Sequence, residues 1–518
     1  MNKELIINAS GNGVEIALLE DKHLVELHYD NSNTNYTVGD LYLGKIKKVM
    51  VGLNAVFVDI GHAKDAFLHY SDLSPTFKSV LKFTEDSIAA ADGSVDFNNF
   101  EIQPEIIKGG KITDVITGKP NILVQIQKEP ISSKGPRISC EISLPGRFIV
   151  LTPFGDFVSV SRKIASNDER KRLQRIIESI KPKNFGVIVR TAAEGQSTAE
   201  LHKDLLDLVA SWKNIQLNLK DATPPTKILA EKSKTTSILR DLLNDDFNSI
   251  VANDENIVEE TKQYLSRIAP EKEKIVSIYK NGLHIFDQYG INKQVKASFG
   301  KTIMLGNGGY LIIERTEALH VVDVNSGHKF GSDSQEDNGL QTNIVAAKEL
   351  ARQIRLRDLG GIIVVDFIDM KNLDNRKVVF NEMELAMSND RARHTILPIS
   401  KFGLLQITRQ RLRPEIEINT GETCPSCHGT GTVRSSELIT DDIENKIDYI
   451  VKNVKQNLEL HVHPILASHL LRTIGLFKDN INKKWNKKFG VKIKVIEEAN
   501  YELIQYTLHD MHGDEIKL

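Results

Sequence analysis

Two aspartates occur where two apolar segments of the chain end. Asp323 lies in LHVVDVNSG and Asp366 in GGIIVVDFIDM, and β-branched residues precede both. Such runs are typical of buried strands, so each carboxylate is expected at the end of a strand. Asn325 follows Asp323 by two residues and therefore shares its face. Carboxylate and amide oxygens suit Mg²⁺ or Mn²⁺ rather than zinc, although an aspartate at a strand end also caps turns and helices.

The segment between the two aspartates has the pattern of a helix. In NIVAAKELARQIRLRDLGG the apolar residues recur at helical spacing, and Gly360 and Gly361 are expected to end the helix. Strand, helix and strand then form a βαβ unit with parallel strands, whose ends lie together. The pattern predicts that Asp323 and Asp366 meet at one edge of a sheet.

A short cysteine motif, CPSCHGTGT, occupies residues 424–432 and contains Cys424 and Cys427. Structural zinc takes four ligands and the chain has no second C-x-x-C, so the simplest arrangement shares one zinc between two chains. A site completed by His428 and a redox pair are the alternatives. Haem attachment at C-x-x-C-H would require export, and no signal peptide is found.

The strand-like segment FGVIVRTAAEGQST ends in Arg190 and Thr191. A guanidinium beside a hydroxyl and free backbone amides predicts an anion site, especially for a terminal phosphate. The alternative is an ion pair between Arg190 and a nearby acid such as Glu194. Ser166 and Ser197 each precede a glutamate by three residues, which is capping-box spacing and predicts a helix after each serine.

From Gly39 onward, short strands separated by glycines predict a small barrel. Phe57 and Phe67 are interleaved there with several lysines. Aromatic rings and lysines on such a barrel can stack bases and neutralise phosphates. The alternative is that both phenyl rings fill the barrel interior.

Other segments are assigned by pattern alone. Residues 1–34 alternate as short hairpins, too few to fold alone, and should join a later segment such as 236–298. Residues 74–103 are polar and acidic and predict an inserted mobile loop or short helix. Residues 433–518 resemble a small α/β appendage. A basic segment provides either a phosphate path or a solvated helix face: Arg391, Arg393, Arg409, Arg411 and Arg413.

Composition sets broad limits. The 518 residues predict roughly three to five domains, and 40% apolar with 26% charged residues describes an ordinary globular chain. A formal charge of -2 leaves nucleic-acid binding to local basic clusters. No apolar run approaches the roughly 20 residues that span a bilayer, and three cysteines make no disulfide framework, so a cytoplasmic protein is expected.

The motifs VVDVNSG, QTNIVAAKELARQIRLRDLGGIIVVDFIDM and CPSCHGTGT together resemble the ribonuclease E/G family of bacterial endoribonucleases, over nearly the whole chain. The length and the C-x-x-C-H-G string are more similar to ribonuclease G than to ribonuclease E. Residues 74–103 are the clearest departure and could redirect single-stranded RNA across the barrel.

The resemblance implies roles for individual residues. The family's magnesium carboxylates fall on Asp323 and Asp366, its orienting amide on Asn325, and its zinc-link on Cys424 and Cys427. The RNA-binding residues of its S1 domain fall on Phe57, Phe67, Lys128 and Lys134. Its pocket for the 5′ monophosphate of RNA falls on Gly146, Val150, Arg190, Thr191 and Arg393.

The implied architecture is multidomain α/β (α+β), with an S1 barrel inserted in an RNase H-like subdomain. The expected ranges are 1–35 with 236–298 for the RNase H-like subdomain, 36–140 for the S1 (OB-fold) domain with its insertion 74–103, 141–235 for the 5′-sensor region, 299–420 for a DNase I-like catalytic subdomain, 421–432 for the zinc-link and 433–518 for a small C-terminal α/β domain.

The expected activity is Mg²⁺-dependent hydrolysis of single-stranded RNA, in ribosomal RNA maturation and mRNA decay, leaving 5′-phosphate and 3′-hydroxyl ends and stimulated by a 5′ monophosphate. Mn²⁺ could replace Mg²⁺, and Asp369 would orient the water or cap the following helix. The shared zinc implies a homodimer, with higher oligomers left open. The alternative is a non-catalytic S1-type RNA-binding or ribosome-assembly protein.

Overall fold

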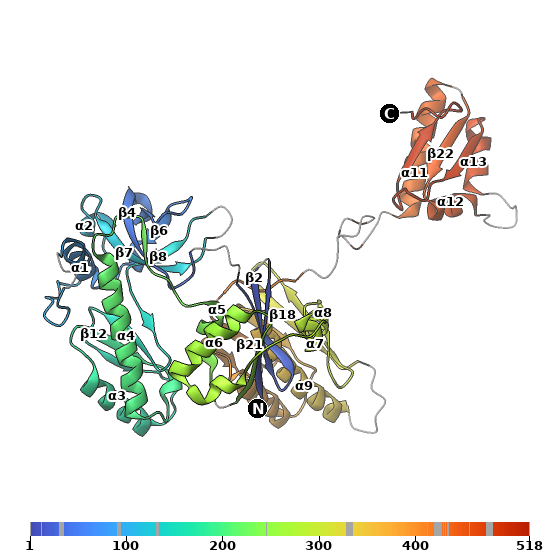
Figure 1. Cartoon of the computed structure of the whole chain (residues 1–518). Helices are drawn as coiled ribbons and strands as arrows, with labels where there is room; N and C mark the ends of the chain where they lie inside the picture. Colours follow the sequence, from blue (N-terminus) through green and yellow to red (C-terminus); the bar gives the residue numbers. More distant parts are fainter. Residues whose placement is uncertain are drawn as a thin grey trace. The chain divides into compact units, whose positions relative to one another are not determined.

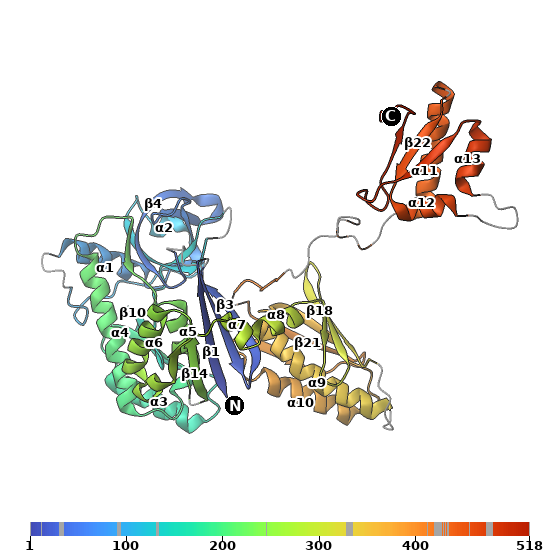
Figure 2. The same cartoon turned by 45° about the vertical axis from the view of Figure 1, so that its right-hand side comes forward.

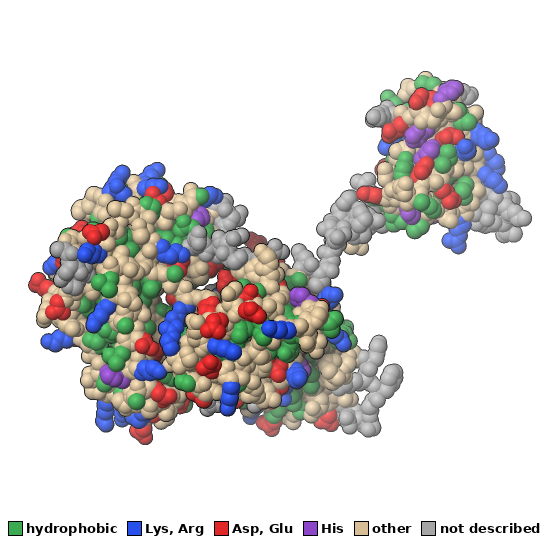
Figure 3. Space-filling view, viewed as in Figure 1, with side chains coloured by type: hydrophobic (Ala, Val, Ile, Leu, Met, Phe, Trp, Pro, Cys, Tyr) green, Lys and Arg blue, Asp and Glu red, His purple; other side chains and the backbone are tan. Residues whose placement is uncertain are grey.

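The computed structural model describes residues 2–11, 13–30, 36–90, 95–130, 134–244, 246–327, 335–411, 413–418, 427, 429, 431, 435–454, 456–472 and 480–516. The chain divides into two compact units, Met1–Ile416 and Glu417–Leu518, and each has its own hydrophobic core. Figure 3 shows acidic and basic side chains interspersed over the visible face of the first unit. Among the helices of the described residues, none has the length and apolar character needed to cross a bilayer.

The first sheet joins the N-terminal hairpins to a much later segment (Figure 2). Its order is β15-β14-β1-β2-β3, with β1 parallel to β14 and antiparallel to β2. Apolar residues of α5 and α6 pack on this sheet, so residues 1–30 obtain their core from residues far along the chain. The bounds are β1 (Lys3–Ser10), β2 (Gly13–Glu20), β3 (His23–Asp30), α5 (Lys234–Leu242), β14 (Phe247–Ala252), α6 (Glu255–Ile268) and β15 (Val276–Ile278).

The second sheet is a closed five-stranded barrel (Figure 1). Strands follow the order β4-β5-β6-β8-β7, and pairing of β4 with β7 closes the barrel, while β13 adds to the outside of β4. Alternate residues such as Val56, Val58 and Leu68 fill the interior. The bounds are β4 (Leu41–Met50), β5 (Ala55–Asp59), β6 (Ala66–His69), α2 (Ile112–Val115), β7 (Asn121–Lys128), β8 (Arg137–Ser139) and β13 (Thr226–Leu229).

The segment 74–103 contains a helix, α1 (Phe77–Ala89), whose apolar residues are buried, rather than an exposed mobile loop. The ring of Phe83 stacks on Trp212 at a centroid distance of 5.1 Å, and Phe97 packs edge-on against Phe83 at 5.5 Å. The helix expected here is therefore present. Phe77 of the segment joins the barrel core, whereas Phe83, Phe97 and Phe100 join the core of the next region, because burial of such large apolar area outweighs the polar composition around them.

The third sheet, β11-β12-β10-β9, is covered by α3 and α4. Both predicted helix starts are confirmed: Ser166 accepts from the backbone N–H of Glu169, and Ser197 forms a full capping box with Glu200. The bounds are β9 (Leu144–Pro145), β10 (Ile149–Pro153), β11 (Val158–Val160), α3 (Asn167–Ile180), β12 (Phe185–Val189) and α4 (Thr198–Leu219).

The fourth sheet has the order β16-β17-β18-β19-β21-β20, and α9 and α10 cover one of its faces (Figure 2). The predicted βαβ unit is confirmed, since β18 and β19 are parallel neighbours joined through α9. The bounds are α7 (Ile285–Gln288), α8 (Ile291–Ser298), β16 (Thr302–Met304), β17 (Tyr310–Arg315), β18 (Leu319–Asn325), α9 (Gln335–Leu356), β19 (Gly361–Asp366), α10 (Leu373–Met387), β20 (His394–Leu397) and β21 (Leu404–Arg409).

The interpretation of β18 and β19 as buried strands is correct for one face and wrong for the other. Val321 is 37% exposed and Ile362 is 48% exposed, whereas their neighbours Val322 and Ile363 are fully buried under the helices. Apolar runs indicate a strand but do not tell how many of its faces are covered. The uncovered face is the one that carries Asp323 and Asp366.

The second unit is a small α/β domain. Its sheet has the order β23-β22-β24, with β22 parallel to β23 and antiparallel to β24. Helices α11, α12 and α13 supply apolar residues to the core, including Trp485. The bounds are α11 (Ser436–Asn453), β22 (Leu458–Val462), α12 (Pro464–Leu471), α13 (Ile481–Phe489), β23 (Ile493–Glu497) and β24 (Tyr506–His509).

Candidate functional site

Asp323 and Asp366 are direct partners across the parallel pairing of β18 with β19. Paired residues on neighbouring strands point to the same face, so both carboxylates project from the uncovered face, about 5 Å apart at the backbone. The side-chain amide of Asn325 donates to the Oδ2 atom of Asp323 over 2.8 Å. The structure therefore places the two predicted carboxylates and the predicted amide together.

A third carboxylate, Asp369, lies three residues beyond the end of β19. Partial burial and the charges of Asp323 and Asp369 raise the pKa of Asp366 above its usual range. Among the described residues no lysine or arginine forms an ion pair with any of these three acids. The local field is thus negative, which disfavours a second anion and favours a cation.

This donor set fits Mg²⁺. Magnesium keeps several waters and uses one or two protein carboxylates together with substrate phosphates, so a pair of aspartates with a nearby amide is sufficient. Within the described ranges, no group of three or more His, Cys, Asp and Glu side chains has the arrangement of a full metal cage. Asp323 and Asp366 are therefore the residues that could hold a hydrated hard cation.

A buried amide holds the backbone next to Asp369. Asn343 of α9 is fully buried, donates to the carbonyl of Ile368 over 2.8 Å and accepts from its N–H over 3.0 Å. Sequence reasoning missed Asn343. A usable signal existed, because Asn343 occupies the same helical stripe as the apolar Ala347, Leu350 and Ile354.

The barrel presents a row of side chains that runs across all five of its strands. Direct partners in the pairing are Lys48, Phe57, Phe67, Arg137 and Lys128, on β4, β5, β6, β8 and β7 in turn. The rings of Phe57 and Phe67 lie 5.8 Å apart and edge-on, and both are half-buried. The outer surface thus combines two aromatic rings with flanking cations, a combination that stacks bases and neutralises phosphates.

The two rings do not fill the barrel interior, because Val56, Val58 and Leu68 already do. Arg137, which sequence reasoning missed, is held by two hydrogen bonds to Asp72 at 2.8 and 2.9 Å. Lys134 is exposed beside this row, three residues before Arg137 in the chain. Strand register brings these residues together, and register is not visible from spacing alone.

Arg190 lies at the end of β12 and binds two partners. Its Nη1 donates to the carbonyl of Gly146 over 2.7 Å, and its Nη2 donates to Asp241 over 2.8 Å. The alternative of an ion pair is therefore observed, but its acid is Asp241 of α5 rather than the nearby Glu194. Burial opposes ionisation of Asp241, but Arg190 and Arg240 outweigh burial and lower its pKa. Arg391 approaches the same carboxylate at 3.9 Å.

Three of the other predicted sensor residues, Gly146, Val150 and Thr191, lie on segments next to Arg190. The hydroxyl of Thr191 lies 3.0 Å from that of Ser161, and Val150 is on β10 beside β12. Gly146 has no room for a side chain, since a Cβ would lie 2.6 Å from the carboxylate of Asp204. That carboxylate accepts from three successive backbone N–H groups, of Arg147, Phe148 and Ile149.

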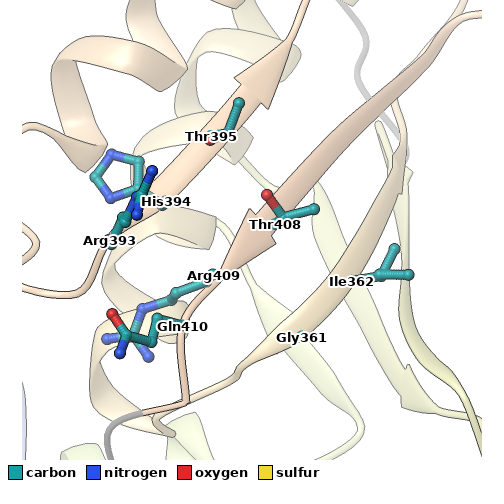
Figure 4. Close-up of a pocket in the computed structure, with 8 residues that line it drawn as sticks. All are labelled: Gly361, Ile362, Arg393, His394, Thr395, Thr408, Arg409 and Gln410. Carbon is teal, nitrogen blue, oxygen red and sulfur yellow. The ribbon is translucent and has the colours of Figure 1, made fainter. Parts of the chain in front are cut away.

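Arg393 lines a separate cavity of about 330 Å³ near the start of β19. Figure 4 shows Arg393 and His394 on one side of this cavity and Gly361 and Ile362 on the other, with Thr408 between them. The contacts thus bring Arg391, rather than Arg393, to the Arg190–Asp241 pair. Spacing alone could not decide between two arginines that are two residues apart.

The prediction of an arginine-lined phosphate path is wrong for Arg409. Its guanidinium is buried and binds Asp390 over 2.6 and 3.0 Å. Arg413 pairs with Asp358, and Arg391 binds Glu26 over 2.8 Å. These arginines belong to an ion network between the first and fourth sheets, because buried charges require partners.

Of the predicted zinc ligands, Cys427 is described and half-buried, whereas Cys424 and His428 lie outside the described residues. The zinc-link therefore stays a prediction.

The fold and the site define a class: a mixed α/β protein in which a closed five-stranded barrel of the S1/OB kind accompanies a sheet that ends in carboxylates. The sequence profile of the ribonuclease E/G family matches residues 143–412. Ribonuclease G of Escherichia coli (strain K12) is 33% identical over 447 residues, 86% of this chain and 88% of the relative.

Two relatives from Haemophilus influenzae (strain ATCC 51907 / DSM 11121 / KW20 / Rd) extend the match. Its ribonuclease G is 34% identical over 508 residues, 98% of this chain and 99% of the relative. Its ribonuclease E is 32% identical over 493 residues, 93% of this chain and 50% of the relative. The chain belongs to the ribonuclease E/G family.

Proposed function

We propose that the chain is a Mg²⁺-dependent endoribonuclease that hydrolyses single-stranded RNA. The observation that carries this proposal is the direct pairing of Asp323 with Asp366 on the uncovered face of a sheet. The aromatic and basic row of the barrel supports a flexible, single-stranded substrate, because bases in a duplex are not free to stack on protein rings.

In the proposed reaction, water attacks the phosphorus atom and the bond from phosphorus to the 3′ oxygen breaks. The 3′ oxygen takes up a proton, so the products carry a 3′-hydroxyl and a 5′-phosphate. Mg²⁺ bound at the site would lower the pKa of the attacking water and neutralise charge on the phosphate. Asp323 and Asp366 would hold the cation, Asn325 orients Asp323 through its hydrogen bond, and Asp369 would accept a hydrogen bond from the water.

The test is cleavage of a 3′-labelled single-stranded RNA in Mg²⁺, with EDTA as the control. Asp323→Asn and Asp366→Asn should abolish cleavage and leave RNA binding within about twofold, since a metal ligand is lost but the fold is not. A 2′-deoxy nucleotide before the cut site should still be cleaved. Retained cleavage in both aspartate variants would refute the proposal, and a requirement for the 2′-hydroxyl would refute the hydrolytic route.

The second candidate is a non-catalytic RNA-binding protein, which the barrel row favours by itself. The two candidates differ in one assay: a non-catalytic protein binds the RNA with the same affinity in Mg²⁺ and EDTA and leaves it intact. The proposed substrates are ribosomal RNA precursors and mRNA. The proposed stimulation by a 5′ monophosphate is supported by the partly exposed guanidinium of Arg190 and the exposed Thr191 that follows it at the end of β12.

We also propose that Cys424 and Cys427 of two chains share one zinc and clamp a homodimer. A tetrahedral site needs four ligands and each chain supplies two thiolates, so about half a zinc per chain is expected. Metal analysis combined with sedimentation tests this. Cys427→Ser should lose zinc and dissociate to monomers, whereas one zinc per chain would indicate a site completed within the chain.

A further inference from the structure

We infer that Phe402 is a base-stacking residue of the cleavage site, which holds a nucleobase next to the phosphate that is cut. The inference rests on the proposed function. Phe402 is 86% exposed, the largest exposed fraction of any large apolar side chain in the described residues. A single exposed phenylalanine is normal on a protein surface and indicates no site by itself. Phe402, however, lies near the carboxylates, in a turn that is closed by hydrogen bonds.

The turn that carries Phe402 connects β20 to β21 and is closed by several hydrogen bonds. The hydroxyl of Ser400 accepts from the N–H groups of Phe402 and Leu404, over 3.3 and 3.2 Å. The backbone N–H of Ser400 donates to the carbonyl of Leu404 over 2.9 Å. Gly403 follows with a φ of +82°, which favours glycine. The backbone of Phe402 is therefore held in a defined turn, and its exposed ring is free to meet a ligand.

The turn lies at the same end of the sheet as the acids. Leu404, two residues after Phe402, is the direct partner of Asp366 in the antiparallel pairing of β21 with β19. A Cβ on Gly403 would lie 3.4 Å from the Oδ1 atom of Asp369. Arg376 also joins the turn to this region, because its side chain donates to the carbonyls of Met370 and Ser400 over 2.9 and 3.5 Å.

Chain geometry sets the distance between the ring and the acids. Phe402 precedes Leu404 by two residues, and Leu404 lies one strand spacing from Asp366. The Cα atoms of Phe402 and Asp366 are therefore within about 12 Å of each other. Stacked bases on one strand are about 3.4 Å apart. A phosphate held at Asp323 and Asp366 thus brings a base about one to three nucleotides away within reach of the ring.

The chemistry of the surroundings favours a base over a protein surface as the occupant. A protein that covered Phe402 would also have to cover the carboxylates of Asp366 and Asp369, which are exposed and lie close to the third acid, Asp323. RNA can approach the same place with a cation between its phosphate and the acids, and Lys401, the exposed residue that precedes Phe402 in the chain, adds a positive charge to the turn. Exposed aromatic rings for base stacking and nearby cations for the phosphates are the two features that single-stranded nucleic acid uses.

The experiment combines protein variants with an abasic scan of the RNA. Phe402→Ala should lower kcat/KM on single-stranded RNA about 5- to 150-fold, Phe402→Trp should retain it, and Phe402→Leu should be intermediate. Leu385→Ala, a 66% exposed residue of α10, is the matched control and should have no effect. Removal of one base near the cut should slow the wild type but not Phe402→Ala, because both changes remove the same stack.

An unchanged kcat/KM for Phe402→Ala would overturn the inference. So would losses from Phe402→Ala and from base removal that add at every abasic position. A changed sedimentation of Phe402→Ala without a loss of cleavage would also overturn it, because it would indicate a protein partner on the ring. Failure of the proposed function is distinct, because the wild type would then cleave nothing in Mg²⁺. In that case quenching of the added tryptophan in Phe402→Trp by RNA still decides whether a base stacks there.

Discussion

The side chain of Asn343 and the backbone of Ile368 exchange two hydrogen bonds, one in each direction, beneath the loop that carries Asp369. A fully buried amide on α9 thus fixes the segment that follows β19. Because Ile368 has no other partner for these groups in the described contacts, the pair couples the crossover helix to the acidic edge of the sheet.

Asn343→Leu should therefore lower kcat about 10- to 100-fold while KM changes little, because Asp369 loses its support but the RNA contacts stay. It should also destabilise the fold by about 1–3 kcal/mol, since the N–H and carbonyl of Ile368 are left unsatisfied. Thr342→Val is the matched control. Thr342 is equally buried, and among the described residues its hydroxyl bonds only to the carbonyl of Asn338 in the same helix, so this variant should keep kcat. Equal losses in both variants would assign Asn343 a purely structural role.

Arg190 is held by Asp241, which any incoming phosphate must displace. Arg190→Ala should slow cleavage of 5′-monophosphate RNA more than of 5′-hydroxyl RNA, by about 10-fold or more, because only the monophosphate offers a dianion to the guanidinium. Asp241→Asn should act in the opposite direction and raise the preference for the monophosphate. Rates on the two RNAs, measured side by side, check both. Parallel slowing on both substrates would make Arg190 a general RNA contact.

The barrel row predicts a salt-dependent term in RNA binding. Lys128→Ala should weaken binding of single-stranded RNA and reduce the slope of log K against log salt by about 0.7, the value for one phosphate contact. Phe67→Ala should weaken binding at all salt concentrations without changing the slope, because stacking is not ionic. Lys171 on α3 is exposed away from the row, and Lys171→Ala serves as the control. An unchanged slope for Lys128→Ala would place the RNA elsewhere on the barrel.

The βαβ unit was predictable because its information is local. Apolar periodicity, the two glycines after the helix and the aspartates at the strand ends all lie within one continuous segment. Because the crossover of a parallel βαβ unit is almost always right-handed, few arrangements of the two strands remain possible. Asp323 accordingly lies next to Asp366, as expected.

Residues that meet through register or through distant sequence were not predictable in the same way. Arg137 joins Phe67 only through the pairing of β8 with β6, and Asp241 reaches Arg190 from 51 positions away. The buried pairing of Arg409 with Asp390 is also a tertiary contact. Composition shows an arginine but not whether a carboxylate will neutralise it.

The ion network between the first and fourth sheets predicts acid sensitivity through His28. The guanidinium of Arg413 can only donate, so the Nδ1 atom of His28 must accept, and Nε2–H donates to Glu26 over 3.1 Å. His28 is therefore neutral when folded. Burial lowers its pKa to about 4, and Arg413 acts in the same direction, whereas the bond to Glu26 opposes it.

The folded pKa lies below the ordinary 6.5, so the unfolded chain binds more protons between these two values. Stability is then fully present above pH 6.5 and is lost as the pH falls toward 4, by about 3 kcal/mol from this group. His28→Gln keeps a donor for Glu26 and an acceptor for Arg413 but does not titrate. Calorimetric unfolding temperatures from pH 7 to 4.5 should fall less steeply for His28→Gln than for the wild type. The exposed His23→Gln should follow the wild type, and a wild-type slope in His28→Gln would show that other groups set the acid sensitivity.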